Sequence, residues 1–415
     1  MTSTQVANRR RRARPEQRLL GLLGPAFVAA IAYVDPGNVA ANLSAGAQYH
    51  YLLVWVLVVA NVMAVLVQYL SAKLGLVTGR SLPELIGTHT PRTGRLLFWA
   101  QAEVIAAATD VAEVIGGAIA LQILFGLPLV AGGIVVSAAS MAILAVQSRN
   151  GQRRFELLVI GLLAVITIGF VAGLTVSDVS WTDAAEGVVP RFADSRSVLL
   201  AASMLGATVM PHAIYLHSTL SRDRHGVGHD PGRLRRLLRA NRWDVVLALA
   251  VAGSVNVAML LLAASSLPGV DGTDTIAGAH HAIQQALGPA IGVIFAVGLL
   301  ASGLASTSVG CYAGATIMEA LVHVRVPLLA RRAVTVIPAL IVLSLAVDPT
   351  WALVISQVVL SLGIPFALIP LAWFTSRRQI MGAFVNGAAL RVSAVVVVTA
   401  IVALNLLLLW LTVAR

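Results

Sequence analysis

Apolar stretches of about 20 residues recur along the whole of this 415-residue chain and constrain its fold more than any other feature. A spanning helix needs about that many consecutive apolar residues, because the hydrocarbon core of a bilayer is about 30 Å thick. Hydrophobic residues make up 58% of the chain and charged residues only 11%, whereas an average soluble domain has about 25% charged residues. Membrane β-strands would appear as alternating segments of about ten residues, which the sequence lacks. We therefore predict an all-α integral membrane protein.

The apolar stretches predict eleven spans, of which the first and the sixth are interrupted. Lys and Arg test this count, because cytoplasmic connections are enriched in them. With a cytoplasmic N-terminus, the predicted cytoplasmic connections are all basic, and the opposite ones carry only Arg191 and Arg196. The predicted spans are 19–46, 51–73, 94–124, 127–147, 155–176, 197–220, 243–267, 282–320, 332–347, 350–373 and 390–413. The basic residues of the cytoplasmic connections are Lys73, Arg80, Arg92, Arg95, Arg149, Arg153, Arg154, Arg222, Arg224, Arg233, Arg235, Arg236, Arg239, Arg242, Arg325, Arg331, Arg332, Arg377, Arg378 and Arg391.

This one-sided distribution also explains the formal net charge of +11, so we predict no nucleic-acid partner. The longest basic connection, 221–242, contains an amphipathic segment after Pro231. That segment could lie on the anionic inner leaflet or could only fix the orientation, and we favour the second. The chain is expected in the inner membrane of a bacterium, with its N-terminus in the cytoplasm and its C-terminus outside.

Two of the predicted spans contain residues that break a helix. The first holds "DPGN" at 35–38 and the sixth holds "MPH" at 210–212. Because the breaks are five spans apart, the second unit starts from the opposite side of the membrane, which is the pattern of an inverted repeat with a transport site at the breaks. The predicted organisation is a basic tail at 1–18, five-span units at 19–176 and 177–373, and an eleventh helix within 374–415.

Each proline removes a backbone donor and frees the carbonyl four residues earlier, which is that of Ala32 for Pro36 and that of Ala207 for Pro211. In lipid, a carbonyl without a partner costs several kcal/mol, and a cation would satisfy it. The alternative is that both prolines only kink their helices and no cation binds at the breaks. An intramembrane carboxylate, here Asp35, is by default a functional group.

Three side chains beside the breaks carry metal-binding atoms: the Asp35 carboxylate, the Asn38 amide oxygen and the Met210 thioether. Oxygen ligands alone suit Ca²⁺ and Mg²⁺, whereas a thioether favours softer ions such as Mn²⁺, Fe²⁺, Co²⁺ and Cd²⁺. The alternative is that Met210 only fills space in the core and binds no metal. No Cys or His cluster of the zinc type is present, and the single cysteine, Cys311, excludes an intramolecular disulfide and is interpreted as helix packing.

The two breaks and several longer motifs resemble the Nramp family of proton-coupled divalent metal transporters. The motifs are "DPGN" (35–38), "MPH" (210–212), "YLHS" (215–218), "NVMAVLVQYLSAKLGLVTG" (61–79), "ATDVAEVIGGAIAL" (108–121), "RRAVTVIPAL" (331–340) and "ISQVVLSLGIPFALIPL" (355–371). The resemblance implies a LeuT-type fold of two inverted five-helix repeats plus an eleventh helix. It also implies metal coordination by Asp35, Asn38, the Ala207 carbonyl and Met210, with Gln357 joining in some conformations. Ala213 departs from the "MPHN" of many members, at a position that supplies no ligand in the family.

Several titratable residues are candidates for proton movement. His212 follows the second break and could be a gate or proton group, or could hydrogen-bond the broken backbone. On an otherwise apolar helix, Asp110 falls within about 20° of Glu103 around the axis and Glu113 about 60° from Asp110, as expected for a relay facing the protein interior. Arg331 and Arg332 fit an orientation signal, whereas the resemblance implies that they receive protons or pair with Asp110 and Glu113.

Three amides could line a vestibule: Asn61 and Gln68 on the second span, and Asn256 on the seventh. Hydrogen bonding between helices is the interpretation that we favour slightly for them. The freed carbonyl of Ala32 belongs to the same region.

These features predict a secondary transporter that imports Mn²⁺ together with protons by alternating access. Fe²⁺, Co²⁺ and Cd²⁺ are expected as further substrates. The first alternative is a LeuT-type symporter of an organic substrate such as an amino acid. The second is a metal or proton channel. No nucleotide motif or catalytic triad supports an enzyme. We expect a monomer in the lipid bilayer, no bound cofactor, and the metal ion and protons as substrates.

Overall fold

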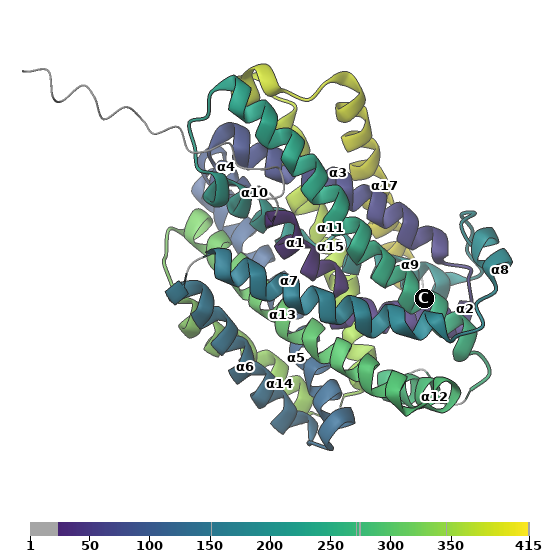
Figure 1. Ribbon diagram of the computed structural model, residues 1–415. Coiled ribbons are helices and arrows are strands. Elements are labelled where there is room, and N and C mark those ends of the chain that lie inside the picture. The colour runs from purple at the N-terminus through teal and green to yellow at the C-terminus, as the bar shows by residue number, and fades with distance from the viewer. Residues whose placement is uncertain (1–23, 151, 271, 274, 346, 414–415) are drawn as a thin grey trace, which may run out of the picture.

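The computed structural model describes residues 24–413 except 151, 271, 274 and 346, and the described part contains helices and no strands (Figure 1). The basic tail predicted at 1–18 and the start of the first span lie outside the described residues. The α-helices are α1 (Pro25–Ala30), α2 (Pro36–Tyr49), α3 (Val54–Thr78), α4 (Leu82–His89), α5 (Arg92–Phe125), α6 (Leu129–Asn150), α7 (Gln152–Val171), α8 (Trp181–Glu186), α9 (Ser195–Thr208), α10 (Pro211–His225), α11 (Pro231–Ser266), α12 (Ile276–Leu287), α13 (Pro289–Val322), α14 (Leu328–Ser344), α15 (Pro349–Thr375), α16 (Arg378–Met381) and α17 (Ala388–Val413). The 3-10 helices are η2 (Ile31–Val34), η3 (Ala172–Thr175) and η4 (Gly382–Phe384).

Eight helical segments of the described chain are long and apolar enough to cross a membrane. They coincide with the predicted second, third, fifth, sixth, seventh, eighth, tenth and eleventh spans. The other three predicted spans are occupied by shorter or broken helices: α1, η2 and α2 for the first, α6 for the fourth, and α14 for the ninth. The arrangement therefore agrees with the predicted count of eleven.

Two predicted boundaries are wrong. The basic segment after Pro231 is the start of α11, which runs unbroken to Ser266 because Asp230 caps its first turn and no helix breaker follows. The eighth span begins at Pro289 and not at 282. Residues 276–287 form the separate helix α12, which ends at Gly288 with a positive φ of 95°.

Helix packing shows the internal repeat. Helix α2 packs on α11 just as α10 packs on α3, and α1 packs on α7 just as α9 packs on α15. In each pair, one contact becomes the other when every helix is replaced by its counterpart in the other five-span unit. The third helices of the two units, α5 and α13, form the most extensive interface of the described chain. The two broken helices therefore lie together in the middle of the bundle (Figure 1).

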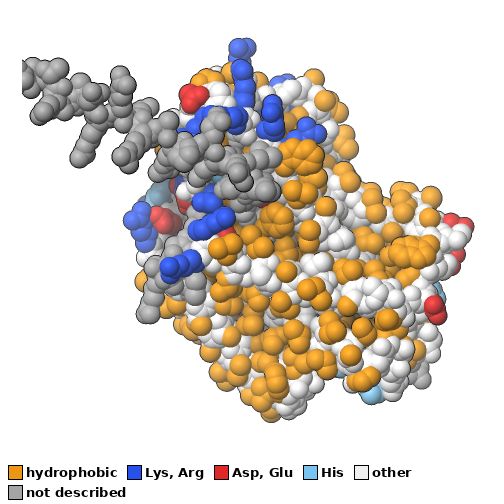
Figure 2. Space-filling model, in the orientation of Figure 1, with side chains coloured by type: hydrophobic (Ala, Val, Ile, Leu, Met, Phe, Trp, Pro, Cys, Tyr) orange, Lys and Arg blue, Asp and Glu red, His pale blue; other side chains and the backbone are white. Residues whose placement is uncertain are grey.

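The molecular surface separates into an apolar band and a basic end. Figure 2 shows hydrophobic side chains over the middle of this face, and Lys and Arg side chains gathered at one end, over α4, α10 and the start of α11. We call this the basic end and define it by Arg80, Arg222, Arg233, Arg325 and Arg377. Helices α8 and α12 and the C-terminal end of α17 lie at the opposite end (Figure 1).

Candidate metal centre

The first helix break is organised by Asp35. This residue has extended backbone angles, φ −71° and ψ 167°, and separates η2 from α2. Its Oδ1 accepts hydrogen bonds from the backbone nitrogen of Asn38 at 2.8 Å and from Asn38 Nδ2 at 2.7 Å. Pro36 occupies the first helical position, where a missing N–H costs nothing. The aspartate is therefore both the cap of α2 and a fully buried carboxylate.

Side chains from two other helices cover the carbonyl groups at this break. Asn256 Nδ2 of α11 donates to the Tyr33 carbonyl at 2.7 Å, and Ser302 Oγ of α13 donates to the Val34 carbonyl at 2.5 Å. The contacts from other helices thus reach Tyr33 and Val34, while Ala32 lies one residue earlier inside η2. These two carbonyls are already partnered and are poor candidates for metal ligands.

The second break is less well supplied with partners. Helix α9 ends at Thr208 and α10 begins at Pro211, and Met210 between them is extended, fully buried and provides no side-chain cap. The Ala207 carbonyl accepts a hydrogen bond from Asn38 Nδ2 at 2.9 Å. Asn38 therefore joins the carboxylate of one break to the carbonyl of the other.

Gln357 of α15 completes the centre. Its Nε2 donates to Asp35 Oδ2 at 3.1 Å. Gly37 permits this approach, because a Cβ there would lie 1.6 Å from Gln357 Nε2. Gly206 allows a second close approach, because a Cβ there would lie 2.2 Å from the Gln357 backbone carbonyl oxygen. The structure thus brings Asp35, Asn38, Ala207 and Gln357 into one hydrogen-bonded group, and Met210 borders the same break.

Two oxygens in this group have no hydrogen-bond partner among the described residues: Asn38 Oδ1 and Gln357 Oε1. Both belong to fully buried side chains. A buried acceptor without a partner costs about 1–3 kcal/mol, and a cation would satisfy both. The described residues contain no group of three or more His, Cys, Asp and Glu that could hold a metal. The donor set is instead mixed, with one carboxylate, two amides, a carbonyl and a thioether, which suits a borderline divalent ion.

His212 lies two residues after Met210 and is 4% exposed. Neither of its ring nitrogens has a hydrogen-bond partner in the described part of the chain. The hydrogen bond to the broken backbone that we considered from sequence is therefore not formed. The imidazole remains available for a proton or a water molecule.

The two arginines of α14 are buried and paired with acids of α5. Arg332 is fully buried and donates to Asp110 Oδ1 at 2.8 Å, to Ser140 Oγ at 3.0 Å and to Thr307 Oγ1 at 2.9 Å. Arg331 donates through both terminal nitrogens to the Glu103 oxygens at 2.9 Å, and not to Glu113. Removing one partner of such a buried pair is strongly destabilising, by about 3–5 kcal/mol.

Glu113 is the acid of α5 that has no ion-pair partner among the described residues. It is fully buried, and neither carboxylate oxygen has a hydrogen-bond partner among the described residues. One turn further along α5, a Cβ on Gly116 would lie 2.0 Å from the Cβ of Pro36. The acidic face of α5 therefore runs from the Glu103–Arg331 pair to the first helix break.

The amides predicted for a vestibule mostly bond between helices. Gln68 Oε1 accepts a hydrogen bond from His217 Nδ1 at 2.7 Å, and Gln68 Nε2 donates to the Tyr33 hydroxyl. Asn256 Oδ1 also accepts from Asn42 Nδ2 at 3.0 Å. Asn61 is half-buried and lies against Gly253 of α11.

Sequence reasoning missed several polar residues at the centre, namely Tyr33, Asn42, His217 and Ser302. The small polar residues of "ASGLASTSVG" in the eighth span, which include Ser302 and Thr307, were the available signal, because such residues gather where membrane helices meet.

The chain is similar in sequence and in structure to known proteins. Residues 26–411 match the family model "Natural resistance-associated macrophage protein-like", Nramp. A "Divalent metal cation transporter MntH" of Mycobacterium tuberculosis is 60% identical over 393 residues, which cover 94% of this chain and 92% of that protein. The crystal structure of the Eremococcus coleocola manganese transporter has a TM-score of 0.84 and 31% identity, with 94% of this chain and 86% of that chain covered.

A more distant structure shares the fold alone. Mhp1, a nucleobase-cation-symport-1 family transporter, has a TM-score of 0.59 and 16% identity, with 93% of this chain and 91% of that chain covered. The predicted LeuT-type architecture of two inverted five-helix repeats and an eleventh helix is confirmed. The helix breaks, the mixed donor set and the family model that spans both repeats lead to one conclusion: the chain belongs to the Nramp family.

Proposed function

We propose that this chain is a divalent metal transporter that imports Mn²⁺ together with protons by alternating access. Fe²⁺, Co²⁺ and Cd²⁺ are its further substrates. The names of the relatives support the metal as substrate: MntH of Mycobacterium tuberculosis is a divalent metal cation transporter and the Eremococcus protein is a manganese transporter. The metal is the cargo, and no resident cofactor is part of the proposal.

One observation carries the proposal. Asn38 Nδ2 bonds both Asp35 Oδ1 and the Ala207 carbonyl, while Asn38 Oδ1 and Gln357 Oε1 have no partner among the described residues. A turn of the two amides would direct their oxygens, the carboxylate and the carbonyl toward a single ion. Met210 would add a sulfur ligand, which disfavours Ca²⁺ and Mg²⁺ relative to Mn²⁺.

The same centre suggests how protons are coupled to the metal. Asp35 exchanges a proton for a metal ion, because only the charged carboxylate is a good ligand. The displaced proton leaves through His212, or along Glu113, Asp110 and Glu103 with Arg332 and Arg331, toward the cytoplasm. The buried ion pairs on α5 and α14 support the second route, because a chain of paired charges inside a membrane protein is typical of a proton relay.

The basic end faces the cytoplasm in this proposal, which puts the N-terminus inside and the C-terminus outside a bacterial plasma membrane. The five proposed ligand residues are fully buried, so a substrate there would be shielded from both sides. We expect a monomer, since each chain contains both halves of the site.

An organic-substrate symporter and a channel are the competing functions. A symporter for an amino acid would not need a sulfur ligand beside Asp35. A channel would not exchange internal for external metal, whereas a carrier accelerates uptake when unlabelled metal is trapped inside. Counterflow of Mn²⁺ in proteoliposomes therefore separates a carrier from a channel.

The deciding experiment compares uptake of Mn²⁺ and Ca²⁺ into proteoliposomes by the wild type and by Met210→Ala. We expect Mn²⁺ uptake without Ca²⁺ uptake in the wild type, and Ca²⁺ uptake by the variant. If neither protein moves Mn²⁺, the metal is not the substrate. If Mn²⁺ moves equally in both and Ca²⁺ in neither, Met210 is packing and selectivity resides elsewhere.

A further inference from the structure

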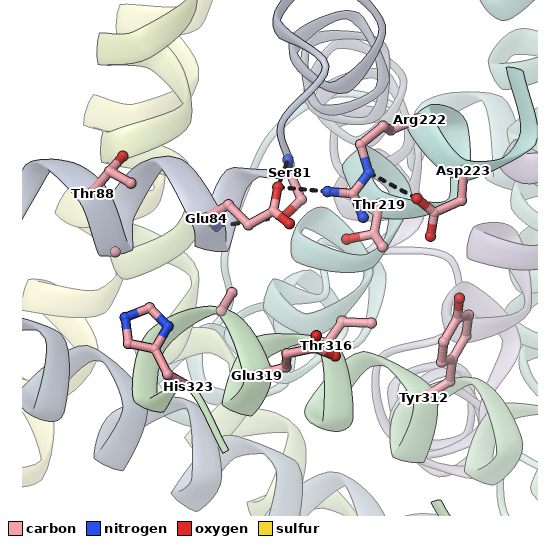
Figure 3. Close-up of a pocket in the computed structure, with 12 residues that line it drawn as sticks. Ser81, Glu84, Thr88, Thr219, Arg222, Asp223, Tyr312, Thr316, Glu319 and His323 are labelled. Carbon is pink, nitrogen blue, oxygen red and sulfur yellow. Dashed lines mark hydrogen bonds and ion pairs between the residues drawn. The ribbon is translucent and has the colours of Figure 1, made fainter. Parts of the chain in front are cut away.

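A second polar site lies at the basic end, away from the helix breaks. A cavity of about 400 Å³ opens there between α4, α10 and α13 (Figure 3). Each of the three helices contributes one carboxylate to its lining: Glu84 from α4, Asp223 from α10 and Glu319 from α13. None of these belongs to the metal centre or to the paired acids of α5.

Local structure holds two of the three carboxylates in place. Glu84 closes the capping box of α4, where its Oε2 accepts from the Ser81 nitrogen at 2.8 Å and from Arg222 Nη1 at 2.5 Å. Asp223 Oδ1 accepts from Arg222 Nε at 2.8 Å. The contacts place Arg222 between two of the acids and use one oxygen of each.

The third carboxylate is more loosely held. Glu319 Oε1 accepts from Arg325 Nε at 2.6 Å, but the arginine side chain is 85% exposed. Such a pair is screened by water and is easily exchanged for another cation. Among the charged residues that line this cavity, three carboxylates are therefore opposed by one arginine, Arg222.

A buried hydroxyl without a partner lies in the same cavity. Thr219 of α10 is 3% exposed, and its Oγ1 has no hydrogen-bond partner among the described residues. Figure 3 shows it between Glu84 and Asp223. Most buried hydroxyls bond to protein or water, so this oxygen is available to a ligand in the cavity.

We propose that this cavity is a second binding site for a divalent cation, held by oxygen atoms of Thr219, Glu84, Asp223 and Glu319. Carboxylate and hydroxyl oxygens suit Mn²⁺, Mg²⁺ and Ca²⁺, and the cavity lining contains no sulfur ligand. The site therefore discriminates less between these ions than the centre that contains Met210. The opposing Arg222 makes it the weaker of the two.

Helix α10 connects the two sites. Thr219 is seven residues after His212, so the two side chains point to within about 20° of each other around the helix axis, two turns apart. A cation that leaves the centre along α10 meets the second site before it reaches the solvent of the basic end. This role in metal release depends on the proposed transport function, whereas cation binding in the cavity does not.

The test is binding of Mn²⁺ to the purified full chain, followed by the electron paramagnetic resonance signal of free Mn²⁺ at a fixed salt concentration. We expect two classes of site in the wild type. Asp35→Asn should lose the tighter class and keep the weaker one. The double variant Asp223→Asn, Glu319→Gln should keep the tighter class and weaken the other at least tenfold. Thr219→Val, which keeps the shape of the side chain, should weaken it several-fold.

A matched control removes two acids from the opposite end, Asp183→Asn with Glu186→Gln in α8, and should change neither class. Mg²⁺ should displace Mn²⁺ from the weaker class much more readily than from the tighter one. The proposal fails if the weaker class is absent from the wild type, survives the double variant, or falls equally in the control. If the tighter class is absent while the weaker one behaves as expected, the proposed transport site is wrong and the second site stands.

Discussion

The two helix breaks that meet at the metal centre are built differently. At the first break, Asp35 caps the following helix, and Asn256 and Ser302 cover the carbonyls that the break exposes. At the second break, Met210 gives no cap, and the bond to the Ala207 carbonyl comes from Asn38, which is itself part of the centre. The exposed carbonyls of the first break are thus covered by partners outside the centre.

The second break depends on what occupies the centre. If a metal ion takes the Asn38 side chain as a ligand, the Ala207 carbonyl loses its hydrogen bond and needs the same ion as a partner. In the proposed site, metal binding and the shape of the second break are therefore coupled, whereas the covered carbonyls of the first break keep their donors. This difference predicts which substitutions damage transport and which damage stability.

The largest effect is expected for Asp35→Asn. Asparagine caps a helix about as well as aspartate does, so the fold should remain, but the only carboxylate of the centre is lost. We expect Mn²⁺ uptake into proteoliposomes to fall on the order of a hundredfold or more, with little change in thermal unfolding. The matched control is Asp348→Asn, which alters the cap of α15 at its exposed end. Uptake within tenfold of the wild type would show that the carboxylate is not the essential charge.

The two glycines that face Gln357 should differ in stability. A Cβ at residue 206 meets the Gln357 backbone oxygen at 2.2 Å, whereas one at residue 37 meets the end of its side chain. Gly206→Ala should therefore cost about 3 kcal/mol, the upper part of the usual range for overpacking, and Gly37→Ala clearly less. Thermal unfolding in detergent measures both. The opposite order would mean that the second break adapts more easily than the first.

A smaller loss is expected when the cover of the first break is removed. Ser302→Ala leaves the Val34 carbonyl buried without its donor and should cost about 1–2 kcal/mol. Ser308→Ala on the same helix is the control, because the Ser308 hydroxyl bonds to Leu304 within its own helix. Equal unfolding temperatures for the two variants would contradict the importance that we assign to the Ser302 bond.

The smallest effect should be the difference between two substitutions of Met210. Met210 has backbone angles compatible with a helix cap but a side chain that cannot serve as one. Met210→Ala and Met210→Ser both remove a fully buried side chain, which costs about 2–5 kcal/mol, and both should decrease the preference for Mn²⁺ over Ca²⁺. The serine variant gains a cap for α10 and should be more stable than the alanine variant by about 0.5–1 kcal/mol. Both thermal unfolding and competitive uptake should be measured. Equal stability of the two variants would indicate that the serine does not cap the helix.

The sequence predicted the architecture because its signals are local. A span is recognised by its own apolar length, and a break by its own proline, so the first and sixth spans could be identified without knowledge of their neighbours. The same local logic failed at α12, whose apolar residues were joined to the eighth span. It also could not show that Arg331 and Arg332 are buried against α5.

By itself, the sequence determined that the chain spans a membrane many times, that two helices break at corresponding depths, and that Asp35, Asn38 and Met210 lie beside those breaks. Only the tertiary structure decided that Asn38 links the two breaks, that Asn256 and Ser302 cover Tyr33 and Val34, and that Arg331 pairs with Glu103. The physical reason is that a hydrogen bond joins residues that are up to 322 positions apart here. Such a partner is selected by how helices pack, and packing is a property of the whole bundle.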